Sequence, residues 1–144
     1  MRRRQGTFSK EKQMGIFIED KDTIDVKVFI LDTGDNIYAD TDKKVLLKRL
    51  KEEKVEGDCT EHVFKIGRMN YRVNVEVTKK SVTMNGEDIS VDPSTYRYER
   101  FVSLVRDWTF KDAKGKKVPV NRSNIDKLNP EVANAVLVKL DSIL

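Results

Sequence analysis

Cysteine, histidine, tryptophan and proline are scarce in this chain, and each scarcity excludes a kind of structure or chemistry. The 144 residues include one Cys, one His, one Trp and three Pro. Cys59 has no second cysteine for an internal disulfide, so packing must stabilise the fold, which suits a reducing compartment such as the cytosol. One His and one Cys also leave little for nucleophilic sites, which need a base beside the nucleophile. We therefore predict a protein that is not an enzyme and has no catalytic residues.

Long apolar runs and glycine-rich phosphate loops are missing as well. No stretch approaches the roughly 18 apolar residues of a membrane span, and the polar N-terminal residues lack the apolar segment of a secretory signal. Neither Gly-x-Gly-x-x-Gly nor Gly-x-x-x-x-Gly-Lys-Ser/Thr occurs, and these are the loops that bind nucleotide phosphates. We expect no membrane partner and no cofactor.

Excess positive charge is confined to residues 1–13. This segment carries five basic residues against Glu11, and its excess equals the +4 net charge of the whole chain, so residues 14–144 are formally neutral. The basic residues are Arg2, Arg3, Arg4, Lys10 and Lys12. Because the segment lacks apolar periodicity, we predict a flexible basic arm that contacts a protein partner or nucleic acid. A solubilising tail or a cloning remnant is the simpler alternative.

Residues 14–144 have the length and apolar content of one folded domain, since 38% of the chain is hydrophobic. Up to residue 90 the apolar residues mostly alternate with polar ones, which predicts antiparallel strands. The predicted strands cover residues 23–31, 62–66 and 71–77, with a short strand near Ile37.

Turn residues connect these strands. Asp32 to Asn36 predicts a turn, and Gly67 to Asn70 a hairpin loop. Asn85-Gly86, between two short β-prone pieces, predicts a second hairpin.

One amphipathic helix is expected among the strands, over residues 41–54. Its apolar stripe is Val45, Leu46, Leu47 and Leu50. We expect Gly57 to end it.

From Asp92 onward the pattern becomes helical. Asp92-Pro93 is a typical helix start. Tyr98, Phe101, Val105 and Trp108 then follow at helical spacing, which predicts a helix that continues to Trp108 and buries this face.

The last third contains a charged turn and two further helices. Asp112 to Gly115 predicts the turn, followed by a return strand stiffened by Pro119. Ser123 and Asp126 resemble a capping box for a short helix. Asn129-Pro130 starts the final helix, whose apolar stripe is Val132, Val136, Leu140 and Ile143. The sequence thus predicts an α+β domain, mainly β over 14–90 and mainly helical over 92–144.

Two groups of residues resemble known chemical sites. Phe29 to Gly34 looks like the Asp-Thr-Gly signature of aspartic proteases, but that chemistry needs two aspartates that share a proton. Asp35 would add charge beside them, so we favour a strand-ending turn and keep a retropepsin-like protease as a third hypothesis. Cys59 and His62 have the spacing of metal ligands, yet zinc needs three or four. We predict no metal site.

The C-terminal 44 residues carry a resemblance to a known group of proteins. Residues 101–108 end in Trp108, an Asp/Gly turn with Gly115 leads to Val118-Pro119-Val120, and Asn124-Ile125-Asp126-Lys127-Leu128 precedes Asn129-Pro130. This arrangement resembles small tailed-bacteriophage morphogenesis proteins, which include tail assembly chaperones and minor tail or neck components. Its recurring elements are packing and turn residues, namely Trp108, Gly115, Pro119, Ile125, Leu128 and Pro130.

The resemblance implies a non-catalytic phage structural or assembly protein that acts through protein-protein contacts in tail or neck morphogenesis. Other phage structural proteins are the expected partners, with self-association left open. The implied location is the host cytoplasm, with presence in the virion also left open. The β-rich N-terminal part departs from mostly helical chaperones and keeps a structural virion component in view. The alternative function is nucleic-acid association through the basic arm.

Overall fold

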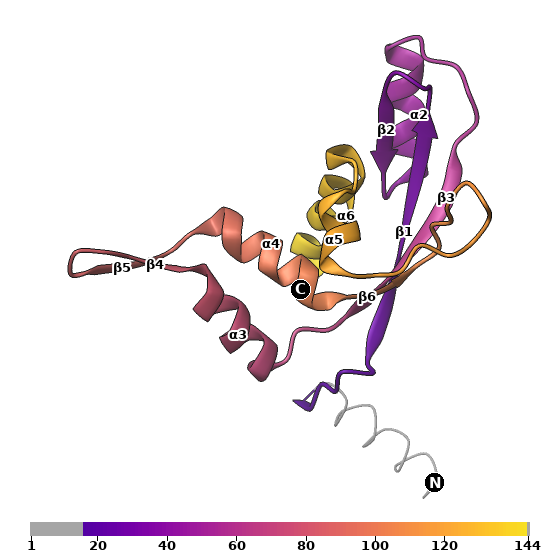
Figure 1. Cartoon of the computed structure of the whole chain (residues 1–144). Helices are drawn as coiled ribbons and strands as arrows, with labels where there is room; N and C mark the ends of the chain where they lie inside the picture. Colours follow the sequence, from indigo (N-terminus) through magenta and orange to yellow (C-terminus); the bar gives the residue numbers. More distant parts are fainter. Residues whose placement is uncertain (1–15, 144) are drawn as a thin grey trace, which may run out of the picture.

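A four-stranded antiparallel sheet organises the fold of the computed structural model, which describes residues 16–143 (Figure 1). The strand order is β2-β1-β3-β6. The strands are β1 (Thr23–Asp32), β2 (Ile37–Asp40), β3 (Thr60–Gly67) and β6 (Val105–Trp108), and a separate two-stranded ribbon is formed by β4 (Val82–Asn85) and β5 (Asp88–Val91). The helices are α2 (Lys43–Glu52), α3 (Tyr71–Ser81), α4 (Pro93–Leu104), α5 (Arg122–Asp126) and α6 (Pro130–Ile143). The fold class is α+β, as the sequence predicted.

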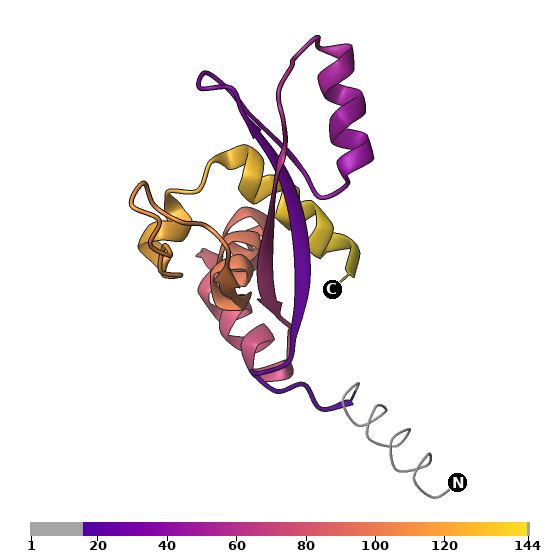
Figure 2. The same ribbon diagram turned by 90° about the vertical axis from the view of Figure 1, so that its right-hand side faces the viewer.

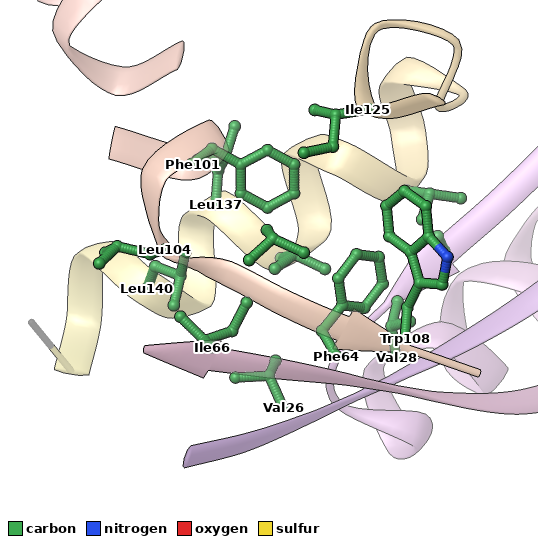
Figure 3. Close-up of a cluster of buried hydrophobic side chains, with 14 of the residues drawn as sticks. Val26, Val28, Phe64, Ile66, Phe101, Leu104, Trp108, Ile125, Leu137 and Leu140 are labelled. Atoms are coloured by element: carbon green, nitrogen blue, oxygen red, sulfur yellow. The ribbon is translucent and has the colours of Figure 1, made fainter. Parts of the chain in front are cut away.

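One face of the sheet and the C-terminal helices enclose the main core. The alternating residues Val26, Val28 and Ile30 of β1 are buried on this face, which confirms the predicted half-buried strand. Figure 3 shows Val26 and Val28 among side chains of β3, β6, α4 and α6. The burial of apolar area is the main stabilising contribution here, at about 25 cal/mol for each Å² removed from water.

Trp108 lies at the centre of this core and is 2% exposed. Its ring meets Phe64 edge-on at a centroid distance of 5.9 Å. Its indole Nε1–H donates a hydrogen bond to the carbonyl oxygen of Val118 at 2.7 Å, so the polar end of the side chain is also satisfied. The prediction that Trp108 is a core residue is confirmed.

Helix α2 packs on the opposite face of the sheet, at the β1–β2 end (Figure 2). Leu46 and Leu50 are buried against Leu31 of β1, whereas Val45 and Leu47 of the predicted stripe are 51% and 47% exposed. The N-cap is Asp42, whose carboxylate accepts the backbone N–H groups of two first-turn residues.

The end of α2 differs from the prediction that Gly57 terminates it. Lys54 adopts the left-handed conformation, with φ of 57°. The Lys54 N–H bonds to the Lys51 carbonyl and the Val55 N–H to the Leu50 carbonyl at 2.8 Å, which is a Schellman ending. Lysine at this position is conformationally unfavourable, because its Cβ crowds the backbone there.

The predicted strand over residues 71–77 is wrong, because these residues form helix α3. Asn70 caps the helix by accepting the Val73 N–H, and Val73, Val77 and Ser81 are buried at a spacing of four. The predicted Gly67–Asn70 hairpin is therefore wrong too. The part expected to hold one helix holds two among its described residues.

The predicted helix to Trp108 is also corrected, since α4 stops at Leu104 and Val105–Trp108 form the edge strand β6. Here pairing with β3, which places Trp108 beside Phe64, prevails over local helical spacing. The capping box at Ser123 is wrong as well: Asn121 caps α5 and accepts the Asn124 N–H. The starts of α4 at Pro93 and α6 at Pro130 are confirmed.

The described helices do not include a membrane span, since none within residues 16–143 is long and apolar enough.

Candidate functional site

The β4–β5 hairpin is the region of the described chain most suited to contact another molecule. It connects α3 to α4 and extends away from the rest of the protein (Figure 1). Asn85 pairs with Asp88, which leaves Gly86 and Glu87 as the two-residue loop. Gly86 has φ of 70°, a conformation that favours glycine at the first loop position of a type II′ turn. The predicted Asn-Gly hairpin is confirmed.

The hairpin has an apolar face and a polar face. Met84 pairs with Ile89, and Val82 pairs with Val91, so these four side chains share one side of the ribbon. On the other side the hydroxyl groups of Thr83 and Ser90 lie 3.1 Å apart.

All eight strand residues of the hairpin are exposed. Met84 is 73% exposed and Ile89 is 67% exposed, whereas Val26, Val28 and Ile30 of β1 are 8% exposed or less. Apolar residues in alternation normally form a strand with one buried side. Val82 and Val91 near the base are 37% and 44% exposed, so the part of this side that the described residues leave most open to solvent is the pair Met84 and Ile89.

The base of the hairpin is held firmly while its tip is free. The Asp92 N–H donates to the Ser81 carbonyl at 2.9 Å, and the buried Ser81 hydroxyl donates to the Val77 carbonyl at 2.6 Å. Helices α3 and α4 also contact each other, with the Tyr96 hydroxyl donating to Asn74 Oδ1 at 3.0 Å. The hairpin is therefore carried on a packed helix pair.

A cleft of about 460 Å³ between α4, α5 and α6 is a second candidate site, and Tyr98 and Asp126 are among the residues that line it. The Tyr98 hydroxyl donates to Asp126 Oδ1 at 2.5 Å, and this hydrogen bond raises the pKa of Tyr98. Arg122 Nη2 forms an ion pair with Glu99 Oε1 at 3.0 Å, and this hydrogen bond raises the pKa of Arg122 above its ordinary value. These groups bond to one another, and structural ion-pair networks also shift pKa values, so the shifts alone do not indicate catalysis.

The predicted arm residues Arg2, Arg3, Arg4, Lys10 and Lys12 lie outside the described residues. The residues behind the resemblance fall in the packed C-terminal part. Ile125 is buried and Leu128 packs partly buried against the core. Gly115 has φ of 79° in the charged turn, Pro119 accepts a hydrogen bond from Asn124 through its carbonyl, and Pro130 begins α6.

Asp32 ends β1 at the predicted turn. Its carboxylate accepts the Gly34 N–H at 2.8 Å, and Thr33 and Asn36 close the turn through a 3.0 Å hydrogen bond. Asp32 and Asp35 line an open pocket of about 500 Å³ together with Glu131 at the start of α6. Within residues 16–143 no three His, Cys, Asp or Glu side chains come together as metal ligands would.

Cys59 and His62, which have ligand spacing in the sequence, serve other contacts here. Cys59 packs beside the small cluster under α2. His62 stacks on Phe110 with ring centroids 4.6 Å apart, and its ring nitrogens lie 3.2 Å from the Thr60 hydroxyl and 3.3 Å from the Thr109 hydroxyl. Partial burial lowers the pKa of His62.

Sequence reasoning located the hairpin but did not identify it as a surface for contacts. The signal that was available is the alternation of Val82 and Met84 with Thr83, mirrored by Ile89 and Val91 around Ser90.

Comparison of the chain with family models, with curated proteins and with solved structures finds no match.

Proposed function

We propose that the chain is a non-catalytic assembly protein that acts through protein-protein contacts. The observation that carries the proposal is the exposed apolar face of the hairpin, on which Met84 and Ile89 are 73% and 67% exposed. An isolated two-stranded ribbon is at best marginally stable in water, and exposed strand edges invite pairing with another chain. A partner that covers this face would stabilise the ribbon and would shield its exposed strand edges from pairing with other chains.

The resemblance of residues 101–144 to tailed-phage morphogenesis proteins supports a role in tail or neck assembly. On that proposal the protein acts in the host cytoplasm and its partners are other phage structural proteins. The packed α3–α4 pair supports the same role, because it fixes the base of the hairpin and holds the ribbon away from the rest of the molecule.

The experiment measures complex formation between the purified full chain and the purified products of the genes encoded beside it. Size-exclusion chromatography with light scattering reports each complex. The test variant combines Met84→Thr and Ile89→Thr, which keeps β propensity but removes most of the exposed apolar area. The control variant combines Thr83→Ser and Ser90→Thr on the polar face.

We expect the parent and the control to form a complex with at least one neighbour, and the test variant to melt normally but lose that complex. A complex that survives the test variant, or a parent that binds none of the neighbouring products, contradicts the proposal.

Nucleic-acid association is the second candidate, because the whole net positive charge falls in residues 1–13. An arm that neutralises about four phosphates gives a slope near −3.6 in a plot of log affinity for duplex DNA against log salt concentration. Deletion of residues 1–13 should abolish that binding and leave the melting midpoint unchanged, since the described apolar core lies within residues 24–140. A parent that shows no affinity for DNA at low salt rules this candidate out.

A further inference from the structure

Helix α2 carries an excess of positive charge, part of which lies where it lowers the stability of the helix. Its ten residues contain five basic side chains and one acidic side chain, and its first turn contains no acid. Lys43 and Lys44 stand at the N-terminus, where the helix dipole favours negative charge, and Lys44 and Lys48 are like charges one turn apart. These placements weaken the start of the helix, whereas Arg49 and Lys51 in the last turn suit the dipole. The lysines at positions 43, 44 and 48 therefore point to a role outside folding.

The exposed side of α2 forms a continuous surface. Lys44, Leu47, Lys48 and Lys51 follow at positions i, i+3, i+4 and i+7, which is one face of a helix, and all four are exposed. We call this set the α2 face. Arg49 lies outside it and pairs with Glu53 at 2.9 Å. The α2 face is therefore an apolar side chain, Leu47, surrounded by three lysines that form no ion pair within residues 16–143.

The hairpin has the opposite character. Residues 82–91 contain no basic side chain, and their two acids, Glu87 and Asp88, stand at the tip. Beside the tip lies the exposed pair Met84 and Ile89. An apolar pair flanked by acids is complementary in charge and polarity to the α2 face.

The sizes of the two surfaces also agree. Four residues of strand extend about 13 Å, and the eight residues of helix from Lys44 to Lys51 extend about 12 Å. In Figure 1 the hairpin and α2 lie at separate extremities of the molecule, with the sheet and α6 between them. The hairpin cannot reach the α2 face of its own chain, although it can reach that of another copy.

We infer that copies of this chain associate head to tail, with the β4–β5 hairpin of one copy seated on the α2 face of the next. This inference rests on the proposed function and adds a second copy to the partners of the hairpin, since the end copy of an open assembly keeps a free hairpin for a neighbouring gene product. Because the two surfaces differ, the contact is heterologous, and a pair of copies keeps one free hairpin on one member and one free α2 face on the other. Such contacts build a ring when the rotation closes and a filament when it does not.

The test uses two full-length double variants, each defective in one surface. The hairpin variant combines Met84→Thr with Ile89→Thr, and the α2 variant combines Lys44→Glu with Lys48→Glu. The α2 variant is expected to fold about as well as the parent, because an acid at position 44 suits the helix dipole, while positions 44 and 48 carry like charges one turn apart in both proteins. Its control, Lys114→Glu with Lys116→Glu, makes the same change in net charge on the exposed turn after β6.

Sedimentation velocity over a range of protein concentrations reports association. We expect the parent and the control to associate, and each double variant alone to associate at least about tenfold more weakly. An equimolar mixture of the two variants should form dimers and stop there, since only one intact hairpin and one intact α2 face remain in each pair. Raising the salt from about 0.05 M to about 0.5 M should weaken all association, because screening shortens the range of the charges.

A parent that stays monomeric, or a mixture that forms no dimer, overturns the inference. An α2 variant that associates as the parent does indicates hairpin-to-hairpin pairing and also overturns it. If the α2 variant loses affinity for duplex DNA while self-association is unchanged, the lysines serve nucleic acid instead. None of these results decides the proposed function, because that proposal is tested by a different measurement, the binding of the parent and the hairpin variant to the neighbouring gene products.

Discussion

Strand β1 and the β4–β5 hairpin have the same kind of sequence and opposite surroundings. Both alternate apolar with polar side chains, yet Val28 of β1 is fully buried whereas Met84 of β4 is 73% exposed. The apolar face of β1 is covered by α6 and α4 of its own chain, whereas Met84 and Ile89 of the hairpin stay mostly exposed among residues 16–143. Alternation of apolar and polar residues therefore predicts a strand with one apolar face. It does not show whether that face is covered by the same chain or by another molecule.

Among variants that test the contrast between β1 and the hairpin, the largest change in stability is expected from a substitution in the core. Trp108→Ala should lower the free energy of unfolding by about 3–5 kcal/mol, the usual cost of deleting a buried large aromatic side chain. It also leaves the Val118 carbonyl without the indole donor. Urea denaturation followed by far-UV circular dichroism measures the change, since the variant lacks the only tryptophan.

Trp108→Phe serves as the control, because it keeps the aromatic ring and should cost less. A Trp108→Ala variant as stable as the parent but deficient in partner binding would contradict the core assignment and erase the contrast with the hairpin.

A smaller effect, of opposite sign, is expected at the end of α2. Lys54→Gly should stabilise the protein by about 1 kcal/mol, because the left-handed conformation strains every residue with a Cβ. Lys48→Gly in the interior of the same helix should instead destabilise it by about 1 kcal/mol. Urea midpoints of the two variants give the comparison, and equal shifts in the same direction would contradict the Schellman ending.

His62, which lies on the core side of β3, should make the stability of the protein depend on pH. Its folded pKa is lowered by burial, so the unfolded chain binds the proton more readily and stability falls as the pH drops through 6.5 towards the folded pKa. Above pH 6.5 this contribution to stability is fully present. As the only histidine, it can be titrated by NMR without ambiguity. His62→Gln should remove this part of the pH dependence, whereas a folded pKa at or above 6.5 would refute the effect.

The smallest effect on stability is expected in the hairpin. Met84→Thr with Ile89→Thr should change the free energy of unfolding by less than about 0.5 kcal/mol, as surface substitutions usually do. Differential scanning calorimetry of the isolated protein measures it. A loss comparable to that of Trp108→Ala would mean that the hairpin belongs to the folding core.

Local signals in the sequence predicted much of the fold, and long-range packing decided what they missed. Residues 71–77 alternate as a strand does, but Val73 and Val77 are also four apart, and the capping residue Asn70 favours the helix that forms. Val105 continues the helical spacing of α4, yet it enters β6 because β3 offers an unpaired edge. Neither choice is encoded in a short window of sequence.

The sequence predicted where the β4–β5 hairpin lies along the chain, but it did not predict that the hairpin is exposed. Asn85-Gly86 marks the position of the turn, whose loop is Gly86 and Glu87, and the alternation on either side predicts which residues share a face. How far the hairpin stands from the core depends on how α3 and α4 pack, which no local pattern specifies. The complementarity of α2 and the hairpin appears only once both are seen to be exposed.

Amide hydrogen exchange of residues 82–91 at low and high protein concentration tests most directly whether the hairpin is covered by another molecule rather than by its own chain. A ribbon held only at its base should open with a free energy close to zero, so at low concentration its amides should exchange rapidly while those of β1 stay protected. We predict that protection of the hairpin amides rises with concentration in the parent and does not rise in the Met84→Thr, Ile89→Thr variant. Protection as strong as that of β1 at every concentration would contradict this account.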